Sequence, residues 1–141
     1  MKLAPYIKAC YPILYVLTPE EARAELMILK TAEDLKRKLR MWSFTDGLTE
    51  GNISEGKKGD PKEVDAVAAL TKLRDEPPSA EGEIIVMRDL HMFLTTPKPI
   101  RLLRDIASLF KKNRKTLIIV SSIKKIPPEL ERDITIIELE L

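Results

Sequence analysis

The stretch from Glu83 to His91, EIIVMRDLH, constrains the fold most strongly. Four consecutive large apolar residues run from Ile84 to Met87. Gly82 precedes the stretch, and the charged pair Arg88 and Asp89 ends the apolar run. A short apolar run that is bounded by charge and rich in β-branched residues is typical of a strand buried on both faces. The stretch therefore predicts a central strand in a mainly parallel sheet.

Other apolar segments predict the remaining strands. They cover residues 13–17, 40–44, 116–121 and 134–139. Helix-length amphipathic segments lie between the first four strands, and residues 126–132 predict a turn or short helix before the last one. Strands that alternate with crossover helices form a parallel sheet with helices on both faces. The sequence therefore predicts a three-layer α/β fold with a five-stranded, mainly parallel sheet.

Capping signals mark the expected helix starts. Thr18, Pro19 and Glu21 form a capping threonine, a proline in the first turn and a capping-box glutamate. The same pattern recurs at Asp60, and it predicts a second helix through about Arg74. The expected core face of the first helix consists of Ala22, Leu26, Leu29, Ala32 and Leu35.

Residues 45–60 contain four of the five glycines and almost no large apolar side chain. Such a segment predicts a flexible surface loop. Apart from this loop, the 141 residues fit a single domain.

Composition excludes several classes of function. The 24 basic and 22 acidic residues give a net charge of +2, which by itself would not recruit nucleic acid. Cys10 is the only cysteine, so the chain has no intrachain disulfide and no cysteine-based metal cluster. His91 is the only histidine, and it cannot build a zinc site alone. No apolar run approaches the roughly 20 residues that a membrane-spanning helix needs. We therefore expect a cytoplasmic protein without a metal site or membrane partner.

The junction between the first strand and the first helix tests for nucleotide binding, because open parallel sheets bind phosphates there. A P-loop needs glycines and a lysine at this position. The junction here, Leu17 to Arg23, has neither, and it carries Pro19 and two glutamates, Glu20 and Glu21. These residues predict that the domain binds no nucleotide cofactor at this junction.

Three polar residues near strand ends remain candidates for a ligand site: Thr18, Asp89 and Ser121. Asp89 follows Arg88, and a guanidinium at the usual metal-ligand position argues against magnesium. Ser121 could sense a phosphate or cap the turn that follows it. His91 lies among apolar residues, which favours a packed core histidine over a catalytic base.

Two basic clusters could bind nucleic acid. The first is Lys57 and Lys58, and the second is Lys111, Lys112, Arg114 and Lys115 at the end of a predicted helix. Cations in a last helical turn complement the helix dipole, so the second cluster could equally be a solvated helix end.

Several segments together resemble the N-terminal region of the uncharacterised AAA-type ATPases encoded in cyanobacterial and red-algal chloroplast genomes and in some phage and bacterial genomes. The matching segments are YPILYV (11–16) followed by Glu20 and Glu21, MWSFTDGL (41–48), VMRDLHMFL (86–94), RLLRD (101–105), KTLIIV (115–120) and IPPELERDI (126–134).

This resemblance implies a Rossmann-like, P-loop-NTPase-like fold that lacks a P-loop, at the N-terminus of a longer ATPase. ATP and magnesium would be bound by a second half, for which 141 residues leave no room. The chain would then be a fragment or a stand-alone relative. By position, Arg132 resembles the arginine finger that reaches a neighbouring subunit's nucleotide.

Three hypotheses for function follow. The first is a non-catalytic regulatory or assembly domain that binds protein partners or other subunits, with no enzymatic activity of its own. The second is a nucleotide sensor in which Thr18, Asp89 and Ser121 face the crevice at the strand ends. The third is a nucleic-acid-binding accessory domain that uses the basic clusters.

Overall fold

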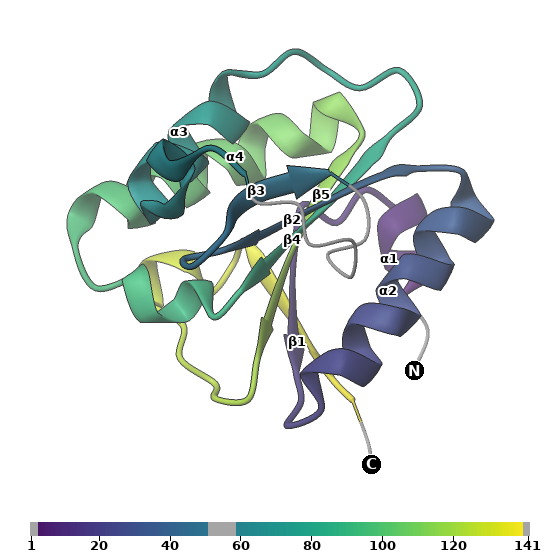
Figure 1. Ribbon diagram of the computed structural model, residues 1–141, viewed down its shortest axis with the longest axis horizontal. Helices are drawn as coiled ribbons and strands as arrows, with labels where there is room; N and C mark the ends of the chain where they lie inside the picture. Colours follow the sequence, from purple (N-terminus) through teal and green to yellow (C-terminus); the bar gives the residue numbers. More distant parts are fainter. Residues whose placement is uncertain (1–2, 51–58, 140–141) are drawn as a thin grey trace.

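The computed structural model describes residues 3–50 and 59–139. Its elements are α1 (Ala4–Lys8), β1 (Ile13–Leu17), α2 (Glu21–Leu35), β2 (Lys38–Ser43), β3 (Gly47–Glu50), η2 (Pro61–Val64), α3 (Ala66–Asp75), β4 (Glu83–Arg88), η3 (Leu90–Phe93), α4 (Pro97–Asn113), β5 (Lys115–Ser121), η4 (Pro128–Leu130) and β6 (Ile134–Glu138), where η denotes a 3₁₀-helix (Figure 1). No helix in these ranges is long and apolar enough to cross a membrane.

The strands form one six-stranded sheet in the order β3-β2-β4-β5-β1-β6. Five strands are parallel, and β3 pairs antiparallel with β2 at the edge. β4 lies between β2 and β5, and residues Glu83 to Met87 are all buried, which confirms the predicted central strand. The predicted α/β fold with a mainly parallel sheet is therefore correct, with one more strand than expected.

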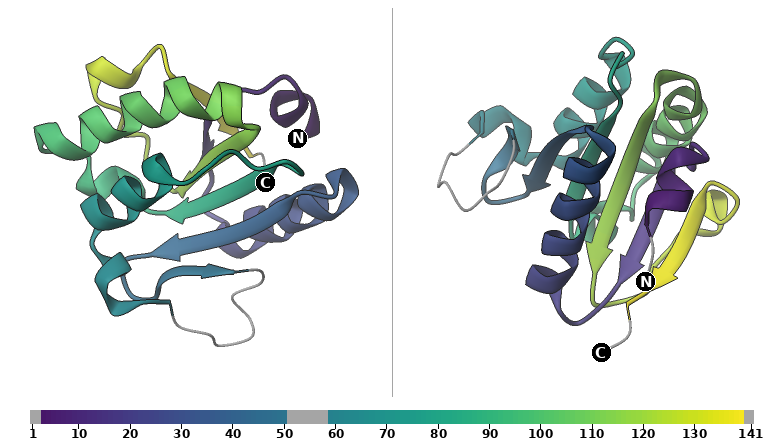
Figure 2. Two further views of the ribbon diagram at one scale, coloured as in Figure 1. Left: turned by 90° about the horizontal axis from the view of Figure 1, so that it is seen from above. Right: turned by 90° about the vertical axis from the view of Figure 1, so that its right-hand side faces the viewer.

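The helices cover both faces of the sheet. α1 and α2 lie on one face, and α3 and α4 lie on the other (Figures 1 and 2). Successive residues of β4 point to opposite faces, so Ile84 and Val86 join the core on the α2 side while Ile85 and Met87 join the core on the α4 side. Both faces of the central strands are thus removed from water, as their unbroken apolar sequences require.

The predicted loop at 45–60 is wrong for residues 47–50, which form β3. Gly47 has a φ of +74°, a conformation open to glycine, and it turns the chain back along β2. The Thr49 hydroxyl donates to the Met41 carbonyl across the two strands, at 3.3 Å. Residues 51–58 lie outside the described ranges.

The first helix begins later than predicted and buries a different face. α2 starts at Glu21, and the Thr18 hydroxyl accepts a hydrogen bond from the Glu20 N–H at 3.0 Å, so Thr18 closes a short turn before the helix. The buried residues are Ala24, Ile28 and Ala32. Leu26, which was expected in the core, is 66% exposed.

The second predicted helix is divided in two. Asp60 accepts a hydrogen bond from the Lys62 N–H and starts only the short helix η2. Asp65 then caps α3 by accepting from the Ala68 N–H at 3.1 Å. The later cap moves the buried face to Ala66, Ala69, Leu70 and Leu73.

Candidate functional site

The carboxyl ends of the parallel strands bring Thr18, Asp89 and Ser121 to one edge of the sheet. The Thr18 N–H donates to the Ser121 carbonyl at 2.9 Å, and the Asp89 N–H donates to the Val120 carbonyl at 3.0 Å. β1 lies between β5 and β6, so the connections that follow β1 and β5 leave in opposite directions. Open α/β sheets bind their ligands at such a switch point.

Thr18 and Ser121 direct their hydroxyls to neighbouring backbone groups. Both residues are 2% exposed. Thr18 accepts from the Glu20 N–H at 3.0 Å, while the Ser121 hydroxyl donates to the Ile123 carbonyl and accepts from the Ile123 N–H, both at 3.0 Å. The Tyr15 hydroxyl also donates to the Ile123 carbonyl and accepts from the Lys125 N–H. The loop after β5 is thereby fixed against the end of β1.

Arg88 contacts the first turns of α2 instead of a ligand. Its Nε lies 2.5 Å from Glu25 Oε2 and 3.5 Å from Glu21 Oε1, and its Nη2 donates to Glu25 Oε1. The hydrogen bonds that Arg88 donates to Glu25 raise the pKa of Arg88. Burial and the neighbouring Glu25 carboxylate raise the pKa of Glu21, although Arg88 opposes that rise.

These residues do not fit the triphosphate of a nucleotide. A phosphate at the start of α2 would meet Glu20 and Glu21, and the nearby guanidinium of Arg88 is already bound to Glu25. The backbone N–H of Glu20 is bonded to Thr18, and Pro19 has none. The position where P-loop proteins hold phosphate therefore carries carboxylates and lacks free N–H groups at Pro19 and Glu20.

Asp89 and His91 lie just beyond β4. Asp89 adopts a left-handed conformation with φ of +55°, and His91 is 6% exposed. Within residues 3–50 and 59–139, His91 Nδ1 has no hydrogen-bond partner. Burial lowers the pKa of His91, the Asp89 carboxylate opposes this, and Lys125 adds to it. Among the same residues no group of three or more His, Cys, Asp and Glu could hold a metal ion.

Three apolar side chains are exposed at the same edge. Phe44 follows β2, Met92 follows β4 and Ile123 follows β5, and they are 45%, 52% and 59% exposed. Because β2, β4 and β5 are neighbours in the sheet, these side chains extend across its carboxyl edge. We refer to Phe44, Met92 and Ile123 as the apolar edge.

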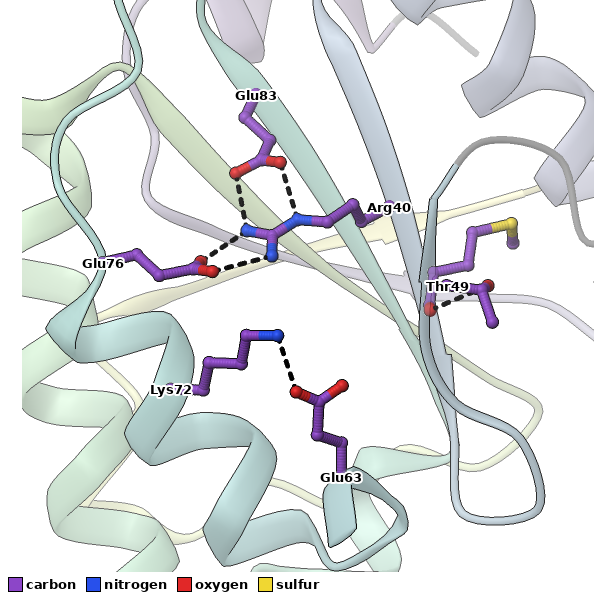
Figure 3. A network of polar contacts seen from close by, with 7 residues as sticks. Arg40, Thr49, Glu63, Lys72, Glu76 and Glu83 are labelled. Carbon is purple, nitrogen blue, oxygen red and sulfur yellow. Dashed lines mark hydrogen bonds and ion pairs between the residues drawn. The ribbon is translucent and has the colours of Figure 1, made fainter. Parts of the chain in front are cut away.

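The opposite, amino edge carries a charge network that the sequence did not reveal (Figure 3). Arg40 of β2 binds Glu83 of β4 through Nε and Nη2 at 2.7 and 2.8 Å, and it binds Glu76 at the end of α3 through Nη1 and Nη2. Burial alone would lower the pKa of Arg40, but the hydrogen bonds that it donates to Glu76 and Glu83 raise it. Nearby, Lys72 bonds Glu63 at 2.6 Å. The network joins two strands to a helix, so its role is structural.

The structure separates the members of the second basic cluster. Lys111, Lys112 and Arg114 are exposed, whereas Lys115 is 3% exposed with its Nζ above the Phe110 ring, 5.8 Å from the centroid. Lys115 is therefore buried beside Phe110 and apart from the exposed cations of the cluster. Lys57 and Lys58 lie outside the described residues.

Arg132 lies just before β6, at the amino edge and away from Thr18 and Ser121. It is exposed and lines a cavity of about 410 Å³ together with Lys111 and Asp133. A larger cavity of about 800 Å³ shares Lys111 and Asp133 and adds Arg74, Arg101 and Arg104. Sequence reasoning missed these three arginines, although Arg101 and Arg104 lie three residues apart on the polar side of α4.

The chain is similar to three curated proteins described as uncharacterised AAA domain-containing protein ycf46. It is 34% identical to the one from Trieres chinensis over 137 residues, 29% identical to that from Guillardia theta over 136 residues and 30% identical to that from Pyropia yezoensis over 136 residues. Each alignment covers 96% of this chain and 26% or 27% of the relative. The chain thus spans about a quarter of the length of these relatives.

A protein-family model provides the same assignment. The model described as SpoVK-like AAA ATPase, N-terminal domain, matches residues 1–139. This match and the relatives confirm the resemblance found in the sequence segments, and they agree with the observed Rossmann-like sheet. The chain therefore belongs to the family of N-terminal domains of SpoVK-like AAA ATPases.

Proposed function

We propose that this chain is a non-catalytic regulatory or assembly domain that mediates contacts with protein partners or with other subunits of an AAA-type ATPase. The observation that carries this proposal is the junction between β1 and α2, where Thr18, Glu20 and Glu21 occupy the position of a phosphate loop. A domain with this fold and without a phosphate site contributes surfaces rather than nucleotide chemistry. In a longer protein of this family, ATP and magnesium would be bound by another part of the chain.

The apolar edge supports a role in protein contact. Phe44, Met92 and Ile123 are each more than two-fifths exposed, and each follows one of three neighbouring strands. Exposed apolar side chains that gather at one edge are typical of interaction surfaces. Arg132 is the candidate for contact with a neighbouring subunit, because it is exposed at the opposite edge.

Calorimetric titration of the purified chain with ATP tests the first part of the proposal. With or without magnesium, we expect no binding heat and no change in melting temperature at millimolar nucleotide, because a ligand that binds only the folded state must raise its stability. Micromolar binding would instead make the chain a nucleotide sensor. The variant Asp89→Asn would then test the site, since Asp89 lies at the same carboxyl edge as Thr18 and Ser121.

A deletion in a longer relative tests the second part. We would remove the matching N-terminal quarter from the Trieres chinensis protein and compare ATP hydrolysis and oligomer size with those of the intact protein. A regulatory or assembly domain predicts that hydrolysis persists while its rate constant or the oligomer size changes. If both quantities stay unchanged under all nucleotide conditions, the proposed role is wrong.

A further inference from the structure

A basic groove lies over the exposed side of α4. The cavity of about 800 Å³ shares lining residues with two others. It shares Lys111 and Asp133 with the cavity that Arg132 lines, and it shares Arg101 and Arg104 with a third cavity near the start of α4. Together these three cavities form what we call the α4 groove. Its cationic side chains are Arg74, Arg101, Arg104, Lys111, Lys112 and Arg132, and its carboxylates are Asp105, Glu129 and Asp133. The groove therefore carries an excess of positive charge on a molecule whose net charge is only +2.

Most of these cations are free to bind a partner. Arg101 and Arg74 reach Asp105 at 3.0 and 3.7 Å. Arg104, Lys111, Lys112 and Arg132 form no ion pair with any residue in the described ranges 3–50 and 59–139. The positive charge of the groove is thus largely unneutralised within the described domain.

The dimensions of the groove suit an extended peptide. Arg101 and Lys112 are separated by eleven positions on α4, which corresponds to about 16 Å along the helix at about 1.5 Å per residue. An extended chain advances about 3.3 Å per residue, so about five residues would span this distance. Leu109, which is half-buried, also lines the groove and offers apolar contact between the charges.

We propose that the α4 groove binds an acidic polypeptide segment of a partner protein. This inference rests on the proposed function, and it specifies the chemistry of one partner. Glutamate and aspartate side chains would pair with Arg104, Lys111 and Arg132. The backbone N–H groups of the segment, or an interspersed lysine, would satisfy Asp133.

The same residues disfavour nucleic acid as the occupant. Asp105, Glu129 and Asp133 would repel a continuous row of phosphates. Tyr11 is the one aromatic residue among those that line the three cavities, so stacked bases would lack a platform. A peptide can alternate its charges to match the groove, whereas a phosphate backbone cannot.

Fluorescence anisotropy with labelled peptides tests the proposal on the folded chain. The probe is a peptide of about ten residues, long enough to span the groove, that alternates glutamate with leucine and glycine. A matched peptide replaces every glutamate with glutamine. We expect the glutamate peptide to bind at least about tenfold more tightly, and we expect this difference to shrink as salt is raised.

Charge-reversal variants then test whether the peptide binds in the α4 groove. The double variant Arg104→Glu/Lys111→Glu should lower the affinity for the glutamate peptide to that of the glutamine peptide, and the milder Arg104→Gln/Lys111→Gln should give an intermediate affinity. The matched control is Lys30→Glu/Lys98→Glu, which makes the same change in net charge at exposed lysines that do not line the groove. The control should retain nearly the wild-type affinity, and circular dichroism confirms that each variant is folded.

The outcomes separate this inference from the proposed function. Equal binding of the two peptides, or equal losses in the groove variant and the control, would overturn the acidic-segment proposal without affecting the assignment of the domain as non-catalytic. A single-stranded oligonucleotide that binds more tightly than the glutamate peptide, and only when the groove is intact, would make the groove a nucleic-acid site. ATP binding in the calorimetric titration would overturn the proposed function while leaving peptide binding to be decided by these measurements.

Discussion

Arg40 and Glu76 form a bidentate ion pair that joins the second strand to the end of α3, with Nη1 2.9 Å from Oε2 and Nη2 2.5 Å from Oε1. The side chains are 13% and 24% exposed. Glu83 binds the same guanidinium from β4. One arginine thus bridges two carboxylates that would otherwise repel each other at the amino edge of the sheet.

Replacing Arg40 with methionine should destabilise the domain by about 3 kcal/mol, because it leaves two partly buried carboxylates without their hydrogen-bonded cation. Urea unfolding monitored by circular dichroism measures the loss. Arg23→Met is the matched control, since Arg23 and Glu20 form an exposed pair with side chains that are 51% and 43% exposed. The control should change stability by less than about 0.5 kcal/mol, and an equal effect of both substitutions would refute the structural role of Arg40.

The ion pair between Glu76 and Arg40 should make the stability of the domain depend on pH. Burial alone would raise the pKa of Glu76, but the hydrogen bonds and charge of Arg40 hold it below its usual 4.5. Because the folded pKa is depressed, the pair contributes its full stabilisation above pH 4.5, and this is lost as pH falls through the folded pKa. Glu76→Gln should therefore be destabilising near neutral pH, and its difference from wild type should shrink as pH falls below 4.5. A difference that stays constant with pH would show that the carboxylate charge is unimportant.

His91 should titrate below the ordinary histidine value of 6.5 in the folded protein, because its ring is buried. As the only histidine, it gives one pair of imidazole C–H resonances, so an NMR pH titration measures its pKa directly. Between 6.5 and the lower folded pKa the unfolded chain binds more protons, so stability should decrease as pH falls through this window. Asp89→Asn removes a charge that favours the protonated ring and should lower the pKa further.

Gly47→Ala should destabilise the β2–β3 hairpin. The φ of +74° disfavours an L side chain, and a Cβ atom there would lie 2.9 Å from the Asp60 carbonyl oxygen. We expect a loss of about 1–3 kcal/mol in the free energy of unfolding. Ala22→Gly provides a reference for the intrinsic glycine effect at an exposed position of α2. Gly47→Asn should be tolerated better than alanine, because asparagine visits the left-handed region more readily.

The sequence predicted the central sheet well because β1, β4 and β5 are apolar runs that are buried on both faces, which leaves little alternative to a central strand. It also predicted α4, whose apolar and charged residues fall on separate faces. The sequence failed at β3, since Gly47 to Glu50 form a short, mostly polar strand that exists only through pairing with β2. The face of α2 was misassigned because apolar residues occur all around that helix, and packing against the sheet decides between them.

The candidate sites show the same limit. Parallel strands bring their carboxyl ends to one edge, so Thr18, Asp89 and Ser121 were expected near each other. Arg88 pairs with Glu25, 63 positions away in the sequence, and Arg40 pairs with Glu83, 43 positions away. No local sequence pattern predicts contacts between residues so far apart in the chain. Lys115 looked like part of a surface cluster because its neighbours are basic, yet it begins a fully buried strand.

The position of β1 has a consequence for how the chain reaches its native state. β1 is synthesised first among the strands, but its neighbours are the last two, and Ile13 pairs with Leu117 and Ile134. About a hundred residues must therefore emerge before the earliest strand finds either partner, and pairing over such distances slows folding. Until then only α1 and α2, or chaperones, can shield its apolar residues from water. A ribosome-bound intermediate truncated before β5 should therefore expose β1.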